Sequence, residues 1–186
     1  MVMPMAEEWT AERARALPDD GKRYEVLDGV LAVTPAPIGV HQLVTGALYR
    51  VLYAYTTEHR IGLALFSPAD IEFSPRRLLQ PDCFVAALVN GRRPTRWDEM
   101  RHLLLAVEVL SPGTARHDRI TKRRIYMEEG VGEYWIADAD ARTIERWRPG
   151  QDRPEIIDGV LRWEPAPNVP PLDLEVGAMF AEALGE

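Results

Sequence analysis

Two acidic residues interrupt the most apolar stretches of the sequence. Asp82 lies in the run 80–85, Gln-Pro-Asp-Cys-Phe-Val, and Glu108 lies in the run 104–110, Leu-Leu-Ala-Val-Glu-Val-Leu. A carboxylate with such neighbours is costly to bury unless a positive group meets it. The partner is either an arginine, in a structural ion pair, or a divalent metal, which oxygen ligands on adjacent strands would suit. For either acid alone, an ion pair or a position at the end of a strand is the simpler interpretation.

A lysine four residues after an acid adds a third candidate. Asp118 and Lys122 have the i, i+4 spacing that places both on one face of a helix, where such a pair is by itself only weakly stabilising. Of the 22 basic residues, 20 are arginine and only two, Lys22 and Lys122, are lysine. An ammonium on a flexible stem can approach a phosphate or a water as a point charge. Rarity and chemistry together make Lys122 a candidate for a catalytic site.

Hydrophobic spacing predicts the elements that must position these residues. Short apolar runs predict strands at 82–89 and 103–110, followed by a charged helix over 115–129 with Ile120 and Ile125 turned inward. The other predicted elements are, in chain order, a short helix at 10–17, a hairpin of strands 23–27 and 30–33 around Asp28-Gly29, a long helix at 40–55, an interrupted strand at 63–73, a strand at 133–137, a closing antiparallel pair at 143–147 and 156–163, and a short C-terminal helix.

The order helix, three strands, helix, strand predicts a mixed α/β fold. The chain has 186 residues, of which 46% are hydrophobic and 27% charged, and this composition is that of one globular domain over 1–186. It excludes a disordered tail and a fibrous repeat. The sequence contains no internal repeat and no low-complexity linker.

The net charge of −7 has the wrong sign for a protein that coats nucleic acid. The distribution is uneven, because segment 92–124 carries nine basic and four acidic residues, net +5, and the remainder carries −12. Such asymmetry fits a cationic groove on an acidic body, and it also fits an arginine-rich solvated helix face. The groove interpretation predicts that phosphate groups are contacted by Arg92, Arg93, Arg119 and Arg123. Binding of nucleic acid would then depend steeply on salt concentration.

Cysteine usage and hydropathy give the expected compartment. The single cysteine, Cys83, cannot form an internal disulfide, and no secretory signal is expected at the start of the chain, so a reducing cytoplasm is the expected location. The longest uncharged stretch, 29–49, contains His41 and Gln42 as well as prolines, which a bilayer would penalise. We therefore predict no transmembrane helix and no membrane partner.

Several motifs, in order, resemble a known group of nucleases. Pro81-Asp82, 25 intervening residues, Glu108-Val109-Leu110 and then Lys122 resemble the PD-(D/E)XK superfamily, in the variant whose lysine lies on the helix after the third strand. Leu110 occupies the place of the usual third-strand lysine. The segment 24–138 is similar to the Uma family of restriction-endonuclease-like proteins in these residues: Tyr24-Glu25, Asp28-Gly29, Pro35, His41, Pro81-Asp82, Glu108 to Pro112, Asp118, Lys122, Tyr126, Gly130-Val131 and Glu133 to Trp135.

The resemblance implies both a fold and an activity. The fold would be a restriction-endonuclease-like core, an α-β-β-β-α-β mixed sheet flanked by helices, here with an N-terminal β-hairpin and extra C-terminal strands. The activity would be metal-dependent hydrolysis of phosphodiester bonds in nucleic acid, DNA in particular. Nucleases of this fold often act as dimers, so a homodimer is expected by analogy.

The resemblance also assigns roles to the central residues. Asp82 and Glu108 would hold a Mg²⁺ or Mn²⁺ ion, with the backbone carbonyl of Val109 as a further ligand. Lys122 would position or activate the attacking water and offset charge that builds on phosphorus.

Three further residues would support this centre. Glu25 and His41 would lie near the metal, as additional ligands, as supporting groups or as contacts to substrate. Asp118 would orient Lys122 or a neighbouring arginine. Tyr126, one turn after Lys122, is expected in the core.

Two other interpretations fit the same residues. The protein could be a non-catalytic binding or assembly module that retains the nuclease fold. Alternatively, the buried acids could pair with Arg119, Arg123 or Arg124 in a structural ionic network, with function elsewhere on the surface. The enzyme classes that depend on certain motifs are excluded, because the chain contains no His-Glu-x-x-His, no paired Cys-x-x-Cys, no Gly-x-Ser-x-Gly and no phosphate-binding glycine loop.

Overall fold

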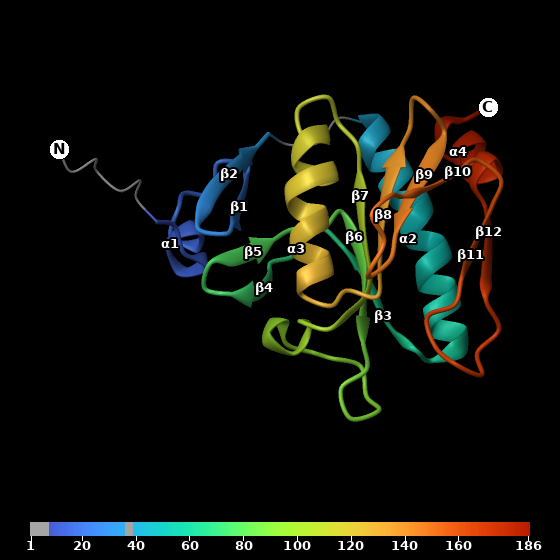
Figure 1. Ribbon diagram of the computed structural model, residues 1–186, viewed down its shortest axis with the longest axis horizontal. Helices are drawn as coiled ribbons and strands as arrows, with labels where there is room; N and C mark the ends of the chain where they lie inside the picture. The colour runs from blue at the N-terminus through green and yellow to red at the C-terminus, as the bar shows by residue number, and fades with distance from the viewer. Residues whose placement is uncertain (1–7, 36–38) are drawn as a thin grey trace.

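In the described part of the chain, two main β-sheets and four α-helices form the architecture (Figure 1). The structure, a computed structural model, describes residues 8–35 and 39–186. The helices are α1 (Ala11–Arg15), α2 (Gly39–His59), the 3₁₀ turn η1 (Trp97–Glu99), the π-helical turn η2 (His117–Lys122), α3 (Arg123–Glu128) and α4 (Val176–Leu184). The strands are β1 (Arg23–Leu27), β2 (Val30–Thr34), β3 (Gly62–Phe66), β4 (Ile71–Ser74), β5 (Arg77–Leu79), β6 (Cys83–Ala87), β7 (Leu103–Val109), β8 (Glu133–Asp138), β9 (Thr143–Trp147), β10 (Glu155–Ile157), β11 (Val160–Trp163) and β12 (Leu172–Glu175).

The larger sheet has six strands in the order β10-β9-β8-β7-β6-β3. Its neighbours are antiparallel except for β7 and β8, which run parallel and are joined by η2 and α3. A parallel pair needs such a crossover, and a helix is its usual form. The core order α2, β3, β6, β7, α3, β8 confirms the predicted mixed α/β arrangement, with a small hairpin of β4 and β5 inserted between β3 and β6.

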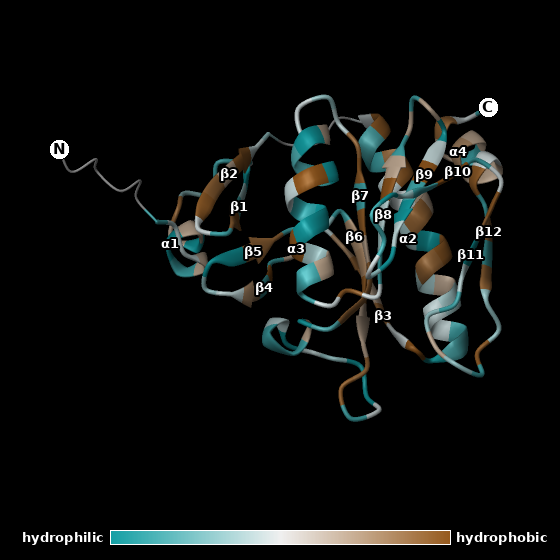
Figure 2. Ribbon diagram, viewed as in Figure 1, coloured by the Kyte–Doolittle hydropathy of each residue, from teal (hydrophilic) through white to brown (hydrophobic). Residues whose placement is uncertain are grey.

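Helices cover both faces of the six-stranded sheet. Alternate residues of β6 and β7 point to opposite sides, as the period of a strand requires. Cys83, Val85 and Val107 face α2, and α4 with the β11-β12 pair extends that layer. Phe84 and Ala106 face α3 on the other side. In Figure 2 the central strands are largely brown, whereas α2 and α3 alternate between brown and teal residues along their length.

The smaller sheet, in the order β2-β1-β5-β4, lies beside α3 at the N-terminal side of the molecule (Figure 1). The predicted hairpin of β1 and β2 is confirmed. Asp28 and Gly29 have φ angles of +53° and +83°, which is the left-handed geometry of a type I′ turn. The Asp28 carboxylate binds Arg77 of β5 at 2.6 Å and also binds Arg124 of α3. These ion pairs hold the hairpin against the helix.

Three details of the sequence prediction are wrong. The interrupted strand at 63–73 is two strands in different sheets, because pairing ends where the Ser67 amide binds the Asp82 carbonyl and the chain leaves for the smaller sheet. The strand at 156–163 also divides, since the chain turns between Ile157 and Val160, so that β10 pairs with β9 whereas β11 pairs with β12. Ile120 is exposed because the inward face of its turn is taken by the polar residues Asp118 and Lys122.

The approach of β8 to β7 depends on a glycine. A Cβ at Gly132 would lie 2.7 Å from the backbone oxygen of Leu104, which cannot move without disturbing β7. We expect Gly132→Ala to lower the free energy of unfolding by about 1–3 kcal/mol in urea denaturation. Gly46→Ala is the control, because its Cβ meets nothing within 4 Å and alanine favours the interior of α2, so this variant should be unchanged or more stable. Equal stabilities of the two variants would contradict this account.

Candidate functional site

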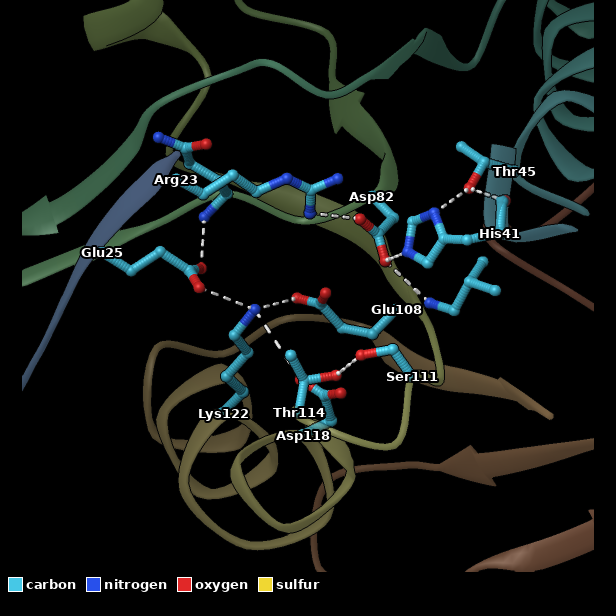
Figure 3. Close-up of polar contacts among 12 residues, drawn as sticks. Arg23, Glu25, His41, Thr45, Asp82, Glu108, Ser111, Thr114, Asp118 and Lys122 are labelled. Carbon is cyan, nitrogen blue, oxygen red and sulfur yellow. Dashed lines mark hydrogen bonds and ion pairs between the residues drawn. The ribbon is translucent and has the colours of Figure 1, made fainter. Parts of the chain in front are cut away.

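A cavity of ≈ 690 Å³ lies between the β1-β2 hairpin, the end of β7 and the turn η2. It brings together all seven residues assigned to a metal, catalytic or supporting role from the sequence, and these come from five separate segments (Figure 3). They are Glu25, His41, Asp82, Glu108, Val109, Asp118 and Lys122. Each of them is buried, so the polar groups lie on the floor of the cavity rather than at its rim.

Lys122 is at the centre of the cluster. Its Nζ donates to Glu108 Oε1 at 3.1 Å, lies 3.0 Å from Glu25 Oε2, and lies 3.7 Å from Asp118 Oδ1. Burial alone would lower the pKa of Lys122, but the carboxylates of Glu108 and Glu25 outweigh it and raise that pKa above its usual value. The side chain is therefore a fixed ammonium ion, shared between a strand of each sheet.

Asp82 is held from three directions. Its Oδ1 accepts a hydrogen bond from Arg23 Nη1 at 2.5 Å, and its Oδ2 accepts from His41 Nε2 at 2.9 Å and from the Val109 amide at 2.8 Å. Thr45 in turn lies 3.5 Å from His41 Nδ1, which orients the ring. Burial would raise the pKa of Asp82, but the His41 hydrogen bond and the Arg23 charge lower it to about 2. This acid is a carboxylate at neutral pH.

The negative charges of Glu108 and Asp118 are less well compensated than that of Asp82. Glu108 accepts from Lys122 and from the Tyr126 hydroxyl at 2.9 Å, both at Oε1, yet burial raises its pKa well above the usual value. Burial likewise raises the pKa of Asp118, whose Oδ1 is buried and has no hydrogen-bond partner. The buried cluster therefore has more negative charge than its cations balance.

The π-helical turn η2 presents two members of the cluster. Asp118 and Lys122 both lie in this turn and both are buried, whereas Ile120 between them is exposed. Single π-helical turns occur mostly as insertions in α-helices, frequently at functional sites. The Tyr134 hydroxyl donates to the Asp118 carbonyl at 3.1 Å and so ties the turn to β8.

Two residues of the site were not identified from the sequence. Arg23 was given no role, although it precedes Glu25 by two positions in a predicted strand, and that spacing places both on one face of the hairpin. Tyr126 was assigned only to the core; it is fully buried there, and its hydroxyl also binds Glu108. The strand period could have found Arg23, but no comparable signal distinguishes Tyr126.

The structure does not bring the four predicted phosphate-binding arginines to the cavity. Arg92 and Arg93 lie on the loop that joins the far ends of β6 and β7, away from Asp82 and Glu108. Arg119 binds Glu145 and Asp138, and Arg123 packs over the Trp147 ring at 4.6 Å. Their contact to nucleic acid stays a prediction.

The ionic network considered as an alternative takes a different form. Arg119, Arg123 and Arg124 do not pair with Asp82 or Glu108 in the described part of the chain. The guanidinium that meets Asp82 is that of Arg23, and Glu108 is met by Lys122.

The donor chemistry of the cavity fits a hard divalent cation. Within residues 8–35 and 39–186, no three His, Cys, Asp or Glu side chains form a ready set of metal ligands. However, Mg²⁺ usually needs only one or two carboxylates, together with water and substrate phosphate. With histidine counted as neutral, four buried carboxylates face two cations, the buried Lys122 and the partly exposed Arg23, which leaves a formal charge of −2. Asp118 Oδ1, which accepts no hydrogen bond, belongs to this excess.

A comparison with protein families identifies the group to which the chain is related. The model described as "Uma2: Putative restriction endonuclease" matches residues 11–177, which is most of the chain. The chain belongs to the Uma2 family. Uma2 membership confirms the resemblance found in the motifs, and it supports a nuclease that acts on nucleic acid by hydrolysis.

A solved structure shows the same fold as this Uma2 protein. The crystal structure of a "putative nuclease belonging to DUF820" from Anabaena variabilis ATCC 29413 matches with a TM-score of 0.75 and 20% identity, covering 94% of this chain and 98% of that chain. This match confirms the predicted mixed α/β fold with its sheet flanked by helices. Among proteins whose functions have been curated, none matches the chain. No helix within the described residues is long and apolar enough to cross a membrane.

Proposed function

We propose that this Uma2 protein is a nuclease that uses Mg²⁺ or Mn²⁺ to hydrolyse phosphodiester bonds in DNA. The observation that carries the proposal is the convergence of Asp82, Glu108 and Lys122 on the floor of one cavity from positions far apart in the sequence. Perturbed carboxyl groups in a cavity, next to a fixed cation, are typical of catalytic sites. Family membership supports the same class of activity.

The roles follow from the contacts. A divalent ion held by Asp82, Glu108 and the Val109 carbonyl would polarise the scissile phosphodiester and lower the pKa of the attacking water. Lys122 directs its ammonium into the cavity, where it positions that water and offsets negative charge on the phosphoryl group. Glu25 holds Lys122 from the opposite sheet, and His41 fixes the orientation of Asp82.

The proposal also covers the domain organisation, the oligomeric state, the location and the role of Asp118. We infer a single domain over 1–186, because the family match extends across both sheets and most of the chain. A homodimer would allow cleavage of both strands of a duplex, and cytoplasmic DNA is the expected substrate pool. Asp118, whose Oδ1 makes no hydrogen bond but lies 3.7 Å from Lys122 Nζ, supports the centre by orienting Lys122 from within η2.

Calorimetric titration with Mn²⁺ tests the proposal. The wild-type protein should bind Mn²⁺ at neutral pH, and Asp82→Ala should weaken binding by at least about 100-fold because a ligand and its charge are lost. Asp98→Ala is the matched control, since Asp98 is exposed, pairs with Arg96 and lies outside the cavity, and it should bind as the wild type does.

The outcome also separates the two candidate functions. If the wild-type protein binds no divalent cation and cleaves neither plasmid nor single-stranded DNA, the nuclease proposal is wrong and the non-catalytic module is favoured.

A further inference from the structure

The Arg23 guanidinium occupies one oxygen of Asp82. Arg23 Nη1 lies 2.5 Å from Oδ1, whereas Oδ2 is held by His41 and by the Val109 amide. Oδ2 already accepts two hydrogen bonds, from a side chain of α2 and from a backbone amide of β7, whereas Oδ1 accepts only that of Arg23 among the described residues. Oδ1 is therefore the oxygen that Asp82 can give to a metal ion, and Arg23 covers it.

Arg23 also makes fewer ion pairs than Lys122 or Arg124, the other long basic side chains that line the cavity in the described part of the chain. Lys122 has three carboxylates around it, and Arg124 binds Asp28 and Glu128. Arg23 makes one ion pair, with Asp82, among the described residues. Its side chain retains 17% exposure, compared with 5% for Lys122.

Arg23 has room to move away from Asp82. Besides the site cavity, it lines a neighbouring hollow of ≈ 510 Å³ that contains Tyr24, Gln42 and Gln80. Since Arg23 is the first residue of β1, its long side chain projects from the end of a strand rather than from its middle. The guanidinium can therefore reorient without a change in the fold.

We propose that Arg23 is a latch on Asp82 that exchanges partners when the site is loaded: it neutralises Asp82 in the empty cavity and transfers to a phosphate of the DNA when a divalent cation takes Oδ1. This inference rests on the proposed function and adds a positioning residue to it. A guanidinium and a divalent cation repel each other and cannot share one carboxylate oxygen closely. The planar fork of a guanidinium matches phosphate oxygens, so the released Arg23 has a suitable partner in the substrate.

Mn²⁺ calorimetry with Arg23→Gln, in the absence of DNA, tests the latch. Because removal of the competing charge frees Asp82, the variant should bind Mn²⁺ at least about 10-fold more tightly than wild type. Arg124→Gln is the matched control, since Arg124 lines the same cavity but does not contact Asp82, and its Mn²⁺ affinity should change less than that of Arg23→Gln.

Binding of a fluorescent DNA oligonucleotide in the presence of Ca²⁺, followed by anisotropy, gives the second readout. Arg23→Gln should bind DNA at least about 10-fold more weakly, because one phosphate contact is lost. If circular dichroism shows that Arg23→Gln does not fold, the wild-type protein is titrated with Mg²⁺ and followed by NMR instead. The Nε–H resonance of Arg23, assigned by its loss in Arg23→Lys, should shift as Mg²⁺ binds.

The possible results separate this inference from the proposed function. If neither wild type nor Arg23→Gln binds Mn²⁺, the metal-dependent nuclease itself is wrong. If wild type binds Mn²⁺ and Arg23→Gln binds it no more tightly, or the Arg23 signal does not respond to Mg²⁺, the site stands and the latch is overturned.

Discussion

Lys122→Ala is expected to reduce DNA cleavage by at least about 10²–10³-fold, the effect of removing one charge-stabilising donor from an active site. The expected loss has two physical causes. The ammonium that lies 3.1 Å from Glu108 and 3.0 Å from Glu25 would no longer position water or offset charge on the phosphoryl group. In addition, three buried carboxylates would lose their common counter-charge, which should lower the free energy of unfolding by about 3–5 kcal/mol.

Two variants separate catalysis from folding in this experiment. Lys122→Arg keeps a positive charge among the carboxylates, so it should be more stable than Lys122→Ala and still cleave slowly, because a planar fork cannot replace a compact ammonium. Lys22→Ala alters the only other lysine, which is exposed and pairs with Asp20, and should leave both rate and stability unchanged. Plasmid and single-stranded substrates measure the rate, and urea denaturation measures stability. Cleavage by Lys122→Ala at the wild-type rate would remove Lys122 from the mechanism.

Glu108→Gln is expected to affect activity and stability in opposite directions. Cleavage should fall by at least about 10²-fold because a metal-binding carboxylate is lost. Without divalent cation, however, the variant should be at least as stable as wild type at pH 8. The glutamine oxygen can still accept from Lys122 and Tyr126, and Lys122 retains Glu25 as a partner, while the buried excess of negative charge is reduced.

The raised pKa of Glu108 predicts how the stability difference between Glu108→Gln and wild type changes with pH. Because the pKa of Glu108 is higher in the folded chain than its ordinary value of 4.5, the folded state holds this proton more tightly than the unfolded state. The contribution of Glu108 to the free energy of unfolding is therefore greatest below pH 4.5, and it decreases as the pH rises above that value. Glutamine has no such proton, so the advantage of the variant should grow between pH 5 and pH 8.

Urea denaturation in EDTA across this pH range measures the difference. Glu145→Gln is the control, since Glu145 is also buried but binds Arg119 outside the cavity, and it should lose stability while cleaving normally. A Glu108→Gln protein that is less stable than wild type at pH 8 would contradict the charge balance described above.

The strands and helices that carry the site could be predicted from local patterns. The apolar runs around Asp82 and Glu108 gave strands because their length and flanking turns allow little else. The hairpin followed from Asp28-Gly29, and the long helix from its apolar spacing. Strand partners could not be predicted in the same way, since the separate pairing of β10 and β11 depends on a turn of two residues whose direction is set by tertiary contacts.

The site could be predicted only as far as single residues were unusual. Asp82 and Glu108 were conspicuous among apolar neighbours, and Lys122 among arginines. Arg23 is one of 20 arginines, so its residue type gives no reason to prefer it, and only its two-residue spacing from Glu25 in a predicted strand points to the site. The π-helical turn could not be predicted from the sequence either, because the spacing of Asp118 and Lys122 is equally compatible with a regular α-helix.

The division of the centre between two sheets has a consequence for immature or damaged copies of the protein. Arg23 and Glu25 belong to the hairpin, whereas Glu108 belongs to the larger sheet and Lys122 to the turn that follows it. A molecule in which the hairpin is not docked lacks both the Glu25 carboxylate that pairs with Lys122 and the Arg23 guanidinium that pairs with Asp82. If the protein is the proposed nuclease, only a chain whose hairpin has docked on the larger sheet would hold the complete charged cluster and be able to cleave its substrate.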